Sequence, residues 1–266
     1  MDLLLTADLI KDFIIRVGDE ALTSWEDLGI EKHADGVDVT TSTDIKIEHE
    51  FYNFIQKHFP DHGFRGEELG ELNRDGEYIW QIDPIDGTKY YAQQVPFWTV
   101  TIALTKNNKP ILGMIYNPIS KQLHHASKGN GAYLNNKRIS LSPEIDIKKL
   151  QISVDIALNS EEYFTRKAKL TAVIEELFSS VYRVRIIGAG AISLAWLAQG
   201  FFGAFVNPYR PGKKIVDVSG GLIIAEEAGA EIYQEKLTGE NDLYNILVAR
   251  SEVLEKLLPI FKGLNN

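Results

Sequence analysis

The chain of 266 residues contains no cysteine. This absence excludes disulfides, thiolate metal sites and cysteine nucleophiles, so any metal must be held by oxygen or imidazole ligands. Basic residues are also few, with 28 lysines and arginines against 37 acidic residues and a net charge of -9. No basic run is dense enough to neutralise a line of phosphates, which argues against a nucleic-acid partner and favours a small ligand.

Long apolar runs are absent too. No uninterrupted apolar stretch reaches the ~18 residues that indicate a membrane span, while 44% hydrophobic residues are typical of a globular protein. Residues 1–22 carry acidic side chains where a signal peptide has positive charge, and their apolar residues recur at helical spacing. We therefore expect an amphipathic helix in a cytoplasmic protein without membrane association.

The order of strand-like and helical segments differs between the two halves of the chain. In the first half, a helix that starts at cap residues 42–44 and ends near Pro60 is followed by strand-like runs. The turn sequence at 106–110 predicts an antiparallel hairpin. The second half alternates strands (149–155, 182–188, 202–207, 245–249) with helices (161–180, 189–200, 216–229, and from 251). We predict an α+β half, residues 1–145, packed on an α/β half, residues 146–266.

The sequence WQIDPIDGTKYY places two carboxylates, Asp83 and Asp86, on either side of a proline. Such a segment alone is more typical of a surface turn. It follows a strand that reads as buried, however, and strand ends are where ligands collect in layered α/β folds. Closely spaced carboxylates there are costly without a cation, and oxygen ligands suit Mg²⁺. Gly87 and Thr88 then offer amides to a phosphate on the far side of the metal.

Two further acidic positions are candidates for the same site. Glu67 and Glu68 follow a glycine in FRGEELGE, and Asp217 interrupts an apolar run in IVDVSGG. Taken singly, the first pair is typical of a solvated loop, and Asp217 is typical of a helix cap or dipole partner.

Together, GEE at 66–68, DPIDGT at 83–88 and VDVSGG at 216–221 resemble the inositol monophosphatase superfamily of Mg²⁺-dependent, lithium-sensitive phosphatases, in order and in spacing. The resemblance covers nearly the whole chain. It implies a layered αβαβα sandwich, commonly a homodimer, with two or three Mg²⁺ ions. It also implies hydrolysis of a small sugar or polyol phosphate by activated water, with inositol 1-phosphate the leading substrate.

The resemblance assigns roles to individual residues. It implies a set of metal ligands: Glu67, Asp83, the carbonyl of Ile85, Asp86 and Asp217. It implies a set of substrate contacts: Asp86, the amides of Gly87 and Thr88, and the backbone of Gly188, Ala189 and Gly190. Thr88 with Glu67 is expected to orient and deprotonate the attacking water. Asp44 matches a position that supports a further, weaker metal through water.

Two departures from the family pattern bear on the substrate. Val216 replaces the usual tryptophan before Asp217, which is expected to affect packing and not ligation. Arg210 stands seven residues before Asp217, where inositol phosphatases carry a glutamate for substrate hydroxyls, and in this it is similar to archaeal enzymes that also act on fructose 1,6-bisphosphate. With Lys213 and Lys214 it forms either a solvated loop or a site for a second anionic group.

Other interpretations stay open. Lys89 and VPFWTVTIAL resemble histidinol-phosphate phosphatases, and DGTK also occurs in 3'-phosphoadenosine 5'-phosphate phosphatases. A metal-binding regulatory relative without turnover is a further alternative. Gly188 and Gly190 half-match the dinucleotide fingerprint, but Ser193 replaces the third glycine and the acidic residue expected about 20 positions further on is missing, which argues against an oxidoreductase.

Overall fold

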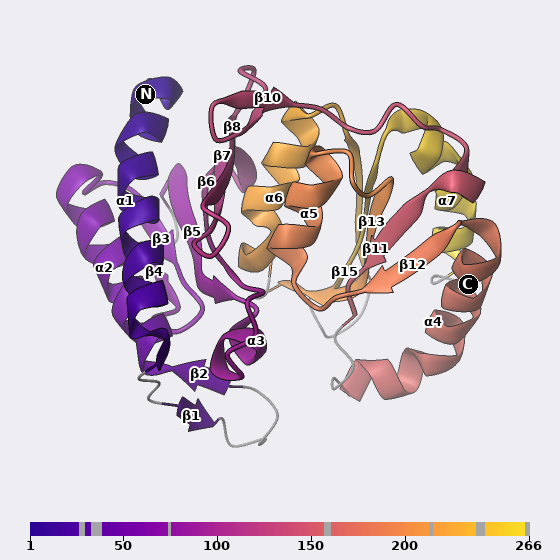
Figure 1. Ribbon diagram of the computed structural model, residues 1–266, viewed down its shortest axis with the longest axis horizontal. Coiled ribbons are helices and arrows are strands. Elements are labelled where there is room, and N and C mark those ends of the chain that lie inside the picture. The colour runs from indigo at the N-terminus through magenta and orange to yellow at the C-terminus, as the bar shows by residue number, and fades with distance from the viewer. Residues whose placement is uncertain are drawn as a thin grey trace.

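A computed structural model describes residues 1–26, 30–32, 39–73, 76–156, 161–212, 215–237 and 243–263. Five layers follow one another across the molecule (Figure 1): two helices, a sheet, two helices, a second sheet and two helices. The predicted αβαβα sandwich is therefore confirmed. Among the helices of the described residues, none has the length and apolar content needed to cross a membrane.

The first layer consists of α1 (Leu3–Thr23) and α2 (Ser42–His58), close to the predicted helices. Asp2 caps α1 by accepting the amides of the first turn. Thr41 and Asp44 form a capping box at the start of α2. The apolar stripes of both helices contribute to one core with the neighbouring sheet.

The second layer is an eight-stranded sheet with the strand order β10-β9-β8-β7-β6-β5-β3-β4. All neighbours are antiparallel except β3 and β5. The predicted hairpin joins β6 and β7 through Asn107 and Asn108, whose φ angles of 51° and 61° suit a tight hairpin turn. The strands are β3 (Gly63–Arg65), β4 (Glu71–Leu72), β5 (Tyr78–Asp86), β6 (Thr99–Lys106), β7 (Lys109–Asn117), β8 (Gln122–Ser127), β9 (Ala132–Leu134) and β10 (Lys137–Ile139).

Strand β5 differs from the prediction, because it does not end before Asp83 but continues through Asp86. Its pairing with β6 is irregular there: Asp83 faces Thr101 and Asp86 faces Thr99, so three steps on β5 match two on β6. Residues three apart on a regular strand point to opposite sides. The extra residue of this bulge therefore lets both carboxylates face one cavity.

The fourth layer is a mixed five-stranded sheet with the order β12-β11-β13-β15-β14. Strand β11 is parallel to β12 and β13, while β15 is antiparallel to β13 and β14. Helices α4 (Glu161–Ser180) and α7 (Ser251–Lys262) cover its outer face (Figure 1). The strands are β11 (Gln151–Val154), β12 (Arg183–Ile186), β13 (Ala204–Pro211), β14 (Glu231–Lys236) and β15 (Leu243–Ala249).

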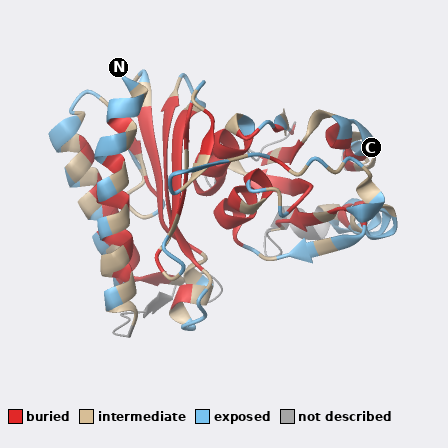
Figure 2. Cartoon of the chain, turned by 45° about the horizontal axis from the view of Figure 1, so that its top comes forward, coloured by how far each residue is buried: buried red, intermediate tan, exposed pale blue. Residues whose placement is uncertain are grey.

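Between the sheets lie α5 (Gly190–Ala198) and α6 (Val216–Glu227). Both are buried on nearly all sides, as Figure 2 shows by their colour, because each faces a sheet in both directions. Each predicted half holds one of the two large sheets, but α6, from the second half, packs on β6 and β7 of the first. The division at residue 145 stays a prediction.

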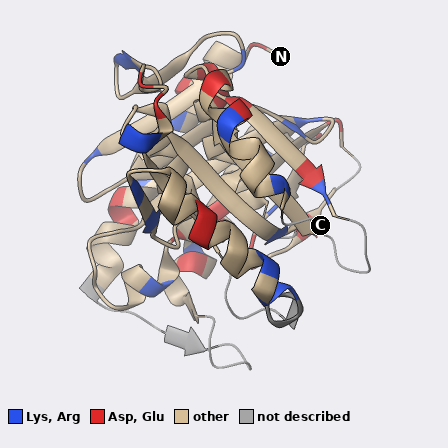
Figure 3. Ribbon diagram, turned by 90° about the vertical axis from the view of Figure 1, so that its right-hand side faces the viewer, with Lys and Arg blue, Asp and Glu red and all other residues tan. Residues whose placement is uncertain are grey.

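The remaining elements of the described residues are the short antiparallel strands β1 (Ile30–Lys32) and β2 (Val39–Thr41), the five-residue helix α3 (Thr88–Ala92) and the 3-10 helices η1 (Ser24–Glu26) and η2 (Ile147–Lys149). Basic and acidic positions are interspersed over several elements on the side seen in Figure 3.

Candidate metal and phosphate site

Most of the predicted site residues line one cavity of about 560 Å³ between the two sheets. The lining includes Glu67, Asp83, Ile85, Asp86, Gly87, Thr88, Gly188, Gly190, Arg210 and Asp217. Asp44 and Ala189, both buried, are not part of that lining. Lys213 and Lys214 lie outside the described residues.

Three carboxylates converge in this cavity. Ligand oxygens of Glu67, Asp83 and Asp217 all lie within 4.8 Å of one another. They come from the loop after β3, from the end of β5 and from the first turn of α6. Segments far apart in the chain are thus folded to one point where a cation can be shared.

The electrostatics of the cluster are those of a cation site. Burial raises the pKa of Asp83 well above its usual range, and the neighbouring carboxylates of Glu67, Asp217, Asp86 and Asp44 raise it further. Ionised carboxylates packed this closely repel one another in a medium of low dielectric constant. A hard divalent cation removes that cost, and an all-oxygen donor set fits Mg²⁺.

Asp86 is anchored from the central layer. Its Oδ2 accepts the amide of Ala191, in the first turn of α5, at 3.1 Å. Burial raises its pKa to about 7, with Asp217 and Asp155 acting in the same direction and Arg210 in the opposite one. The hydrogen bond from the Ala191 amide fixes the orientation of the Asp86 carboxylate.

The turn from Asp83 to Thr88 is held by its own hydrogen bonds. Asp83 Oδ1 accepts the amide of Ile85 at 3.0 Å, and the Thr88 hydroxyl donates to the carbonyl of Ile85 at 2.9 Å. Gly87 has a φ of 95°, and a Cβ on it would lie 3.1 Å from the carbonyl oxygen of Phe97. Only glycine adopts that backbone without strain.

Asp44 caps the N-terminus of α2. Its Oδ2 accepts the amide of Thr41 at 2.9 Å and also the hydroxyl of Thr41. Burial raises the pKa of Asp44 to about 7, although the bonds from Thr41 lower it. Its support of a further metal stays a prediction.

Arg210 is not in a solvated loop. It lies on β13, is 8% exposed, and donates through one nitrogen to Asp155 Oδ2 at 2.9 Å and through another to Asp217 Oδ2. Its guanidinium therefore links two carboxylates of the cavity lining, Asp155 and the proposed metal ligand Asp217. Binding of a second anionic group by Arg210 stays a prediction.

Sequence reasoning missed Asp155 and Asn207, which also line the cavity. The Asn207 side-chain amide donates to the backbone carbonyl of Asp155 at 2.6 Å. Both are polar residues at the ends of predicted strands, 149–155 and 202–207. The strand-end rule that singled out Asp83 would have found them.

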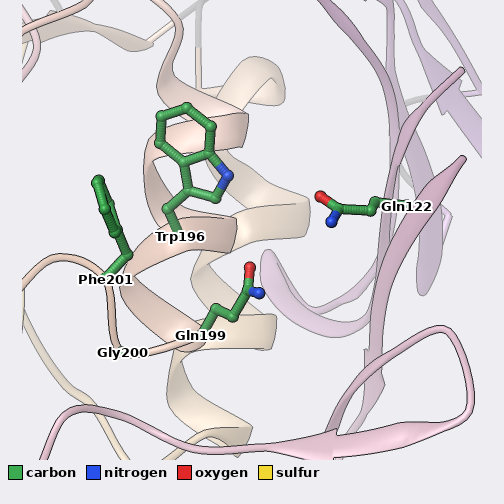
Figure 4. A pocket seen from close by; sticks show the side chains of 5 residues that line it. All are labelled: Gln122, Trp196, Gln199, Gly200 and Phe201. Carbon is green, nitrogen blue, oxygen red and sulfur yellow. The ribbon is translucent and has the colours of Figure 1, made fainter. Parts of the chain in front are cut away.

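A second cavity, of about 500 Å³, has a different chemistry. It is lined by Gln122, Trp196, Gln199, Gly200 and Phe201. In Figure 4 the side chains of Gln122, Gln199 and Trp196 point towards a common space, and the ring of Phe201 lies on the outer side. This lining contains no carboxylate and no cation, so the acidic cavity is the candidate for catalysis.

The spacing of the acidic motifs over the whole chain agrees with a known family. The model of the inositol monophosphatase family matches residues 8–261. The chain belongs to this family. It is 32% identical over 206 residues to inositol monophosphatase 3 of Solanum lycopersicum, an alignment that covers 76% of this chain and 75% of that relative. It is 31% identical over 222 residues to the fructose-1,6-bisphosphatase/inositol-1-monophosphatase of Aquifex aeolicus, which covers 83% and 80% of the two chains.

The fold agrees with solved structures of the family. An inositol monophosphatase from Anabaena superposes with a TM-score of 0.81 at 27% identity, over 98% of this chain and 96% of that one. Inositol monophosphatases are Mg²⁺-dependent phosphoric monoester hydrolases, so the chain is a Mg²⁺-dependent phosphatase of sugar phosphates. The predicted family and enzyme class are confirmed, while the roles of the single residues stay predictions.

Proposed function

We propose that this inositol monophosphatase family member hydrolyses a small polyol or sugar monophosphate, with inositol 1-phosphate first, in the cavity around Asp83. The convergence of Glu67, Asp83 and Asp217 to within 4.8 Å carries the proposal. The same cavity presents Gly87 and Thr88, the residues expected to contact phosphate.

The acidic residues provide ligands for two or three ions. In the proposal, Glu67, Asp83 and the Ile85 carbonyl hold one Mg²⁺, while Asp83, Asp86 and Asp217 hold another. Asp44 supports a third, weaker one. When bound by these residues, Mg²⁺ would lower the pKa of a water molecule and would neutralise the charge that develops on the leaving ester oxygen.

The chain's own groups orient the reaction. The Thr88 hydroxyl donates a hydrogen bond to the Ile85 carbonyl, so its oxygen is free to accept a hydrogen bond from one O–H of the attacking water. Glu67 takes up the other proton of that water as its oxygen attacks phosphorus in line with the ester oxygen. The bond between phosphorus and the ester oxygen breaks, the proton held by Glu67 passes through solvent to the leaving oxygen, and the amides of Gly87 and Thr88 hold the phosphate.

Asp155 and Arg210 supply specificity at the same cavity. A carboxylate and a guanidinium side by side can accept from and donate to the hydroxyls of a polyol. A second phosphate on the substrate would compete with two carboxylates for Arg210, which favours a monophosphate. The name of the Aquifex relative nevertheless makes fructose 1,6-bisphosphate the second candidate.

Phosphate release tests the proposal. The purified protein is assayed with inositol 1-phosphate, fructose 1,6-bisphosphate, histidinol phosphate and 3'-phosphoadenosine 5'-phosphate, with Mg²⁺ and with EDTA. We expect release from inositol 1-phosphate that requires Mg²⁺ and is lost in Asp86→Asn. Asp61→Asn, the same change at an exposed position, serves as the control. Mg²⁺ binding without release from any substrate would instead identify a regulatory relative.

We also propose a homodimer. Two apolar side chains at the edge strand β12 are more than half exposed, Tyr182 directly before the strand and Ile186 at its end. Phe178 and Phe201 are exposed to a similar extent. Large exposed apolar groups beside an open sheet edge favour a protein partner. Sedimentation analysis tests this, since Ile186→Glu should convert the dimer to a monomer.

We also propose a cytoplasmic location, because the apolar residues of α1 pack in the hydrophobic core of the first sheet.

A further inference from the structure

Glu48 is a fully buried carboxylate on α2, with an exposed fraction of 0%. It shares the buried face of the helix with Asp44, Phe51 and Ile55. Burial raises the pKa of Glu48, and backbone amides of the segment that follows β3 lower it. Glutamate is rarely buried to this extent unless its charge has partners, so the contacts of Glu48 are informative.

The partners of Glu48 directly follow Glu67 in the chain. The amide of Glu68 donates to Oε2 of Glu48 at 2.9 Å, and the amide of Leu69 donates to Oε1 at 2.6 Å. Successive amides turned to one anion form a concave binding site for it. The backbone just after Glu67 is therefore tied to α2.

The backbone just before Glu67, at Gly66, packs directly against the carboxylate of Glu48. A Cβ on Gly66 would lie 1.8 Å from Oε1 of Glu48, so only glycine allows this approach. The amide of Gly66 donates to the carbonyl of Gly70 at 2.9 Å, which closes the loop 66–70. Glu67 is thus held from both sides, while its own carboxylate reaches the acidic cluster.

The chain offers an internal comparison. Glu227, near the end of α6, accepts the amides of Gly129 and Gly131, each at 2.7 Å. Asp217 lies ten residues earlier on that helix, ~15 Å away at 1.5 Å per residue. Glu227 therefore ties a loop that contains none of the proposed ligands.

We propose that Glu48 is a positioning residue for the metal site, holding the loop 66–70 so that Glu67 is presented to Asp83 and Asp217. The inference rests on the proposed function, because it takes Glu67 as a metal ligand. A ligand whose backbone is already ordered loses less conformational entropy when the metal binds. Groups that orient metal ligands change metal affinity by ~10–100-fold when they are replaced.

Calorimetric titration of the full chain with Mg²⁺ alone tests the inference. Glu48→Gln keeps the length of the side chain but replaces one carboxylate oxygen by an NH2 group. This group cannot accept a hydrogen bond, so one of the two loop amides of Glu68 and Leu69 loses its acceptor. We expect Mg²⁺ affinity to fall ~10-fold, while kcat at saturating Mg²⁺ stays within about twofold. Glu50→Gln on the same helix, where Glu50 pairs with Arg16, should leave the affinity unchanged. Glu227→Gln should lower the melting temperature only.

A second variant approaches the contact from the loop. Gly66→Ala should also weaken Mg²⁺ binding, and it keeps the test decisive if Glu48→Gln does not fold. Both changes act on one contact. The double variant should therefore bind Mg²⁺ with about the affinity of whichever single variant binds it less tightly. Unchanged affinity in folded Glu48→Gln, or additive effects, would overturn this inference alone. Wild-type protein that does not bind Mg²⁺ would overturn the proposed function and the inference with it.

Discussion

At the scale of single residues, Arg210 stands out because it is a buried cation between two carboxylates. Its side chain contacts Asp155 and Asp217, and these two acids together with Asp86 and Asp83 raise its pKa, although burial lowers it. Removing one member of a buried ion pair leaves the other charges without compensation. Arg210 therefore stabilises the acidic cavity in addition to any contact with substrate.

We predict that Arg210→Gln lowers the free energy of unfolding by about 3 kcal/mol in EDTA, the cost of breaking a buried pair from one side. Mg²⁺ should restore part of the loss, because a bound cation compensates the same carboxylates. Urea denaturation with and without Mg²⁺ measures both effects. The exposed Arg183→Gln should change little. Equal stability of Arg210→Gln and wild type in EDTA would show that the ion pairs contribute nothing net.

At the scale of elements, the approach of α6 to the first sheet depends on glycines. A Cβ on Gly113 of β7 would lie 2.4 Å from the carbonyl oxygen of Gly220 and 2.6 Å from Cγ2 of Ile223. A Cβ on Gly220 would in turn lie 2.9 Å from the hydroxyl of Thr101. This close packing sets the position of α6, and with it the position of Asp217 in its first turn.

Gly113→Ala is therefore expected to cost about 1–3 kcal/mol of stability, because the nearest contacting atom is the backbone carbonyl oxygen of Gly220, which cannot move aside unless α6 shifts. Mg²⁺ affinity should fall as well, since α6 must shift and carries Asp217 with it. Thermal denaturation and calorimetry measure the two effects. Gly76→Ala, whose added Cβ has its nearest atom at 3.2 Å, should cost less. Wild-type behaviour of Gly113→Ala would contradict the packing argument.

At the scale of the whole molecule, an acidic chain with a net charge of -9 also concentrates carboxylates in its interior. Burial raises the pKa of Asp44 and of Asp86 to about 7, and it raises that of Asp83 as well. A carboxyl with a raised pKa binds its proton more tightly in the folded state than in the unfolded chain. Without metal, the contribution of these three carboxyls to stability is therefore largest at low pH and decreases as pH rises from their unfolded pKa near 4 to about 7.

We predict that the melting temperature in EDTA falls between pH 5 and pH 7.5, and that stabilisation by Mg²⁺ grows over the same range. The metal favours the ionised carboxylates, so its binding releases the protons that these groups hold. Differential scanning fluorimetry at several pH values measures both trends, each kcal/mol corresponding to ~2–4 °C. Asp86→Asn should flatten both. A melting temperature in EDTA that rises towards pH 7.5 would contradict the assignment.

The sequence by itself determined the longer helices, one hairpin and the chemistry of the motifs. Helices such as α1 and α4 and the β6–β7 hairpin depend on periodicity, caps and turn residues, which act over a few positions. The pair Asp83 and Asp86 was recognisable for the same reason, since spacing and residue type identify an oxygen-rich cation site.

Only the tertiary structure decided how these groups meet. The bulge that turns Asp83 and Asp86 to one cavity depends on pairing with β6, and the contact of Arg210 with Asp155 joins residues 55 positions apart. The bond from the Glu68 amide to Glu48 likewise spans 20 positions. Local propensity carries no information about such partners, because they are brought together by the packing of whole layers.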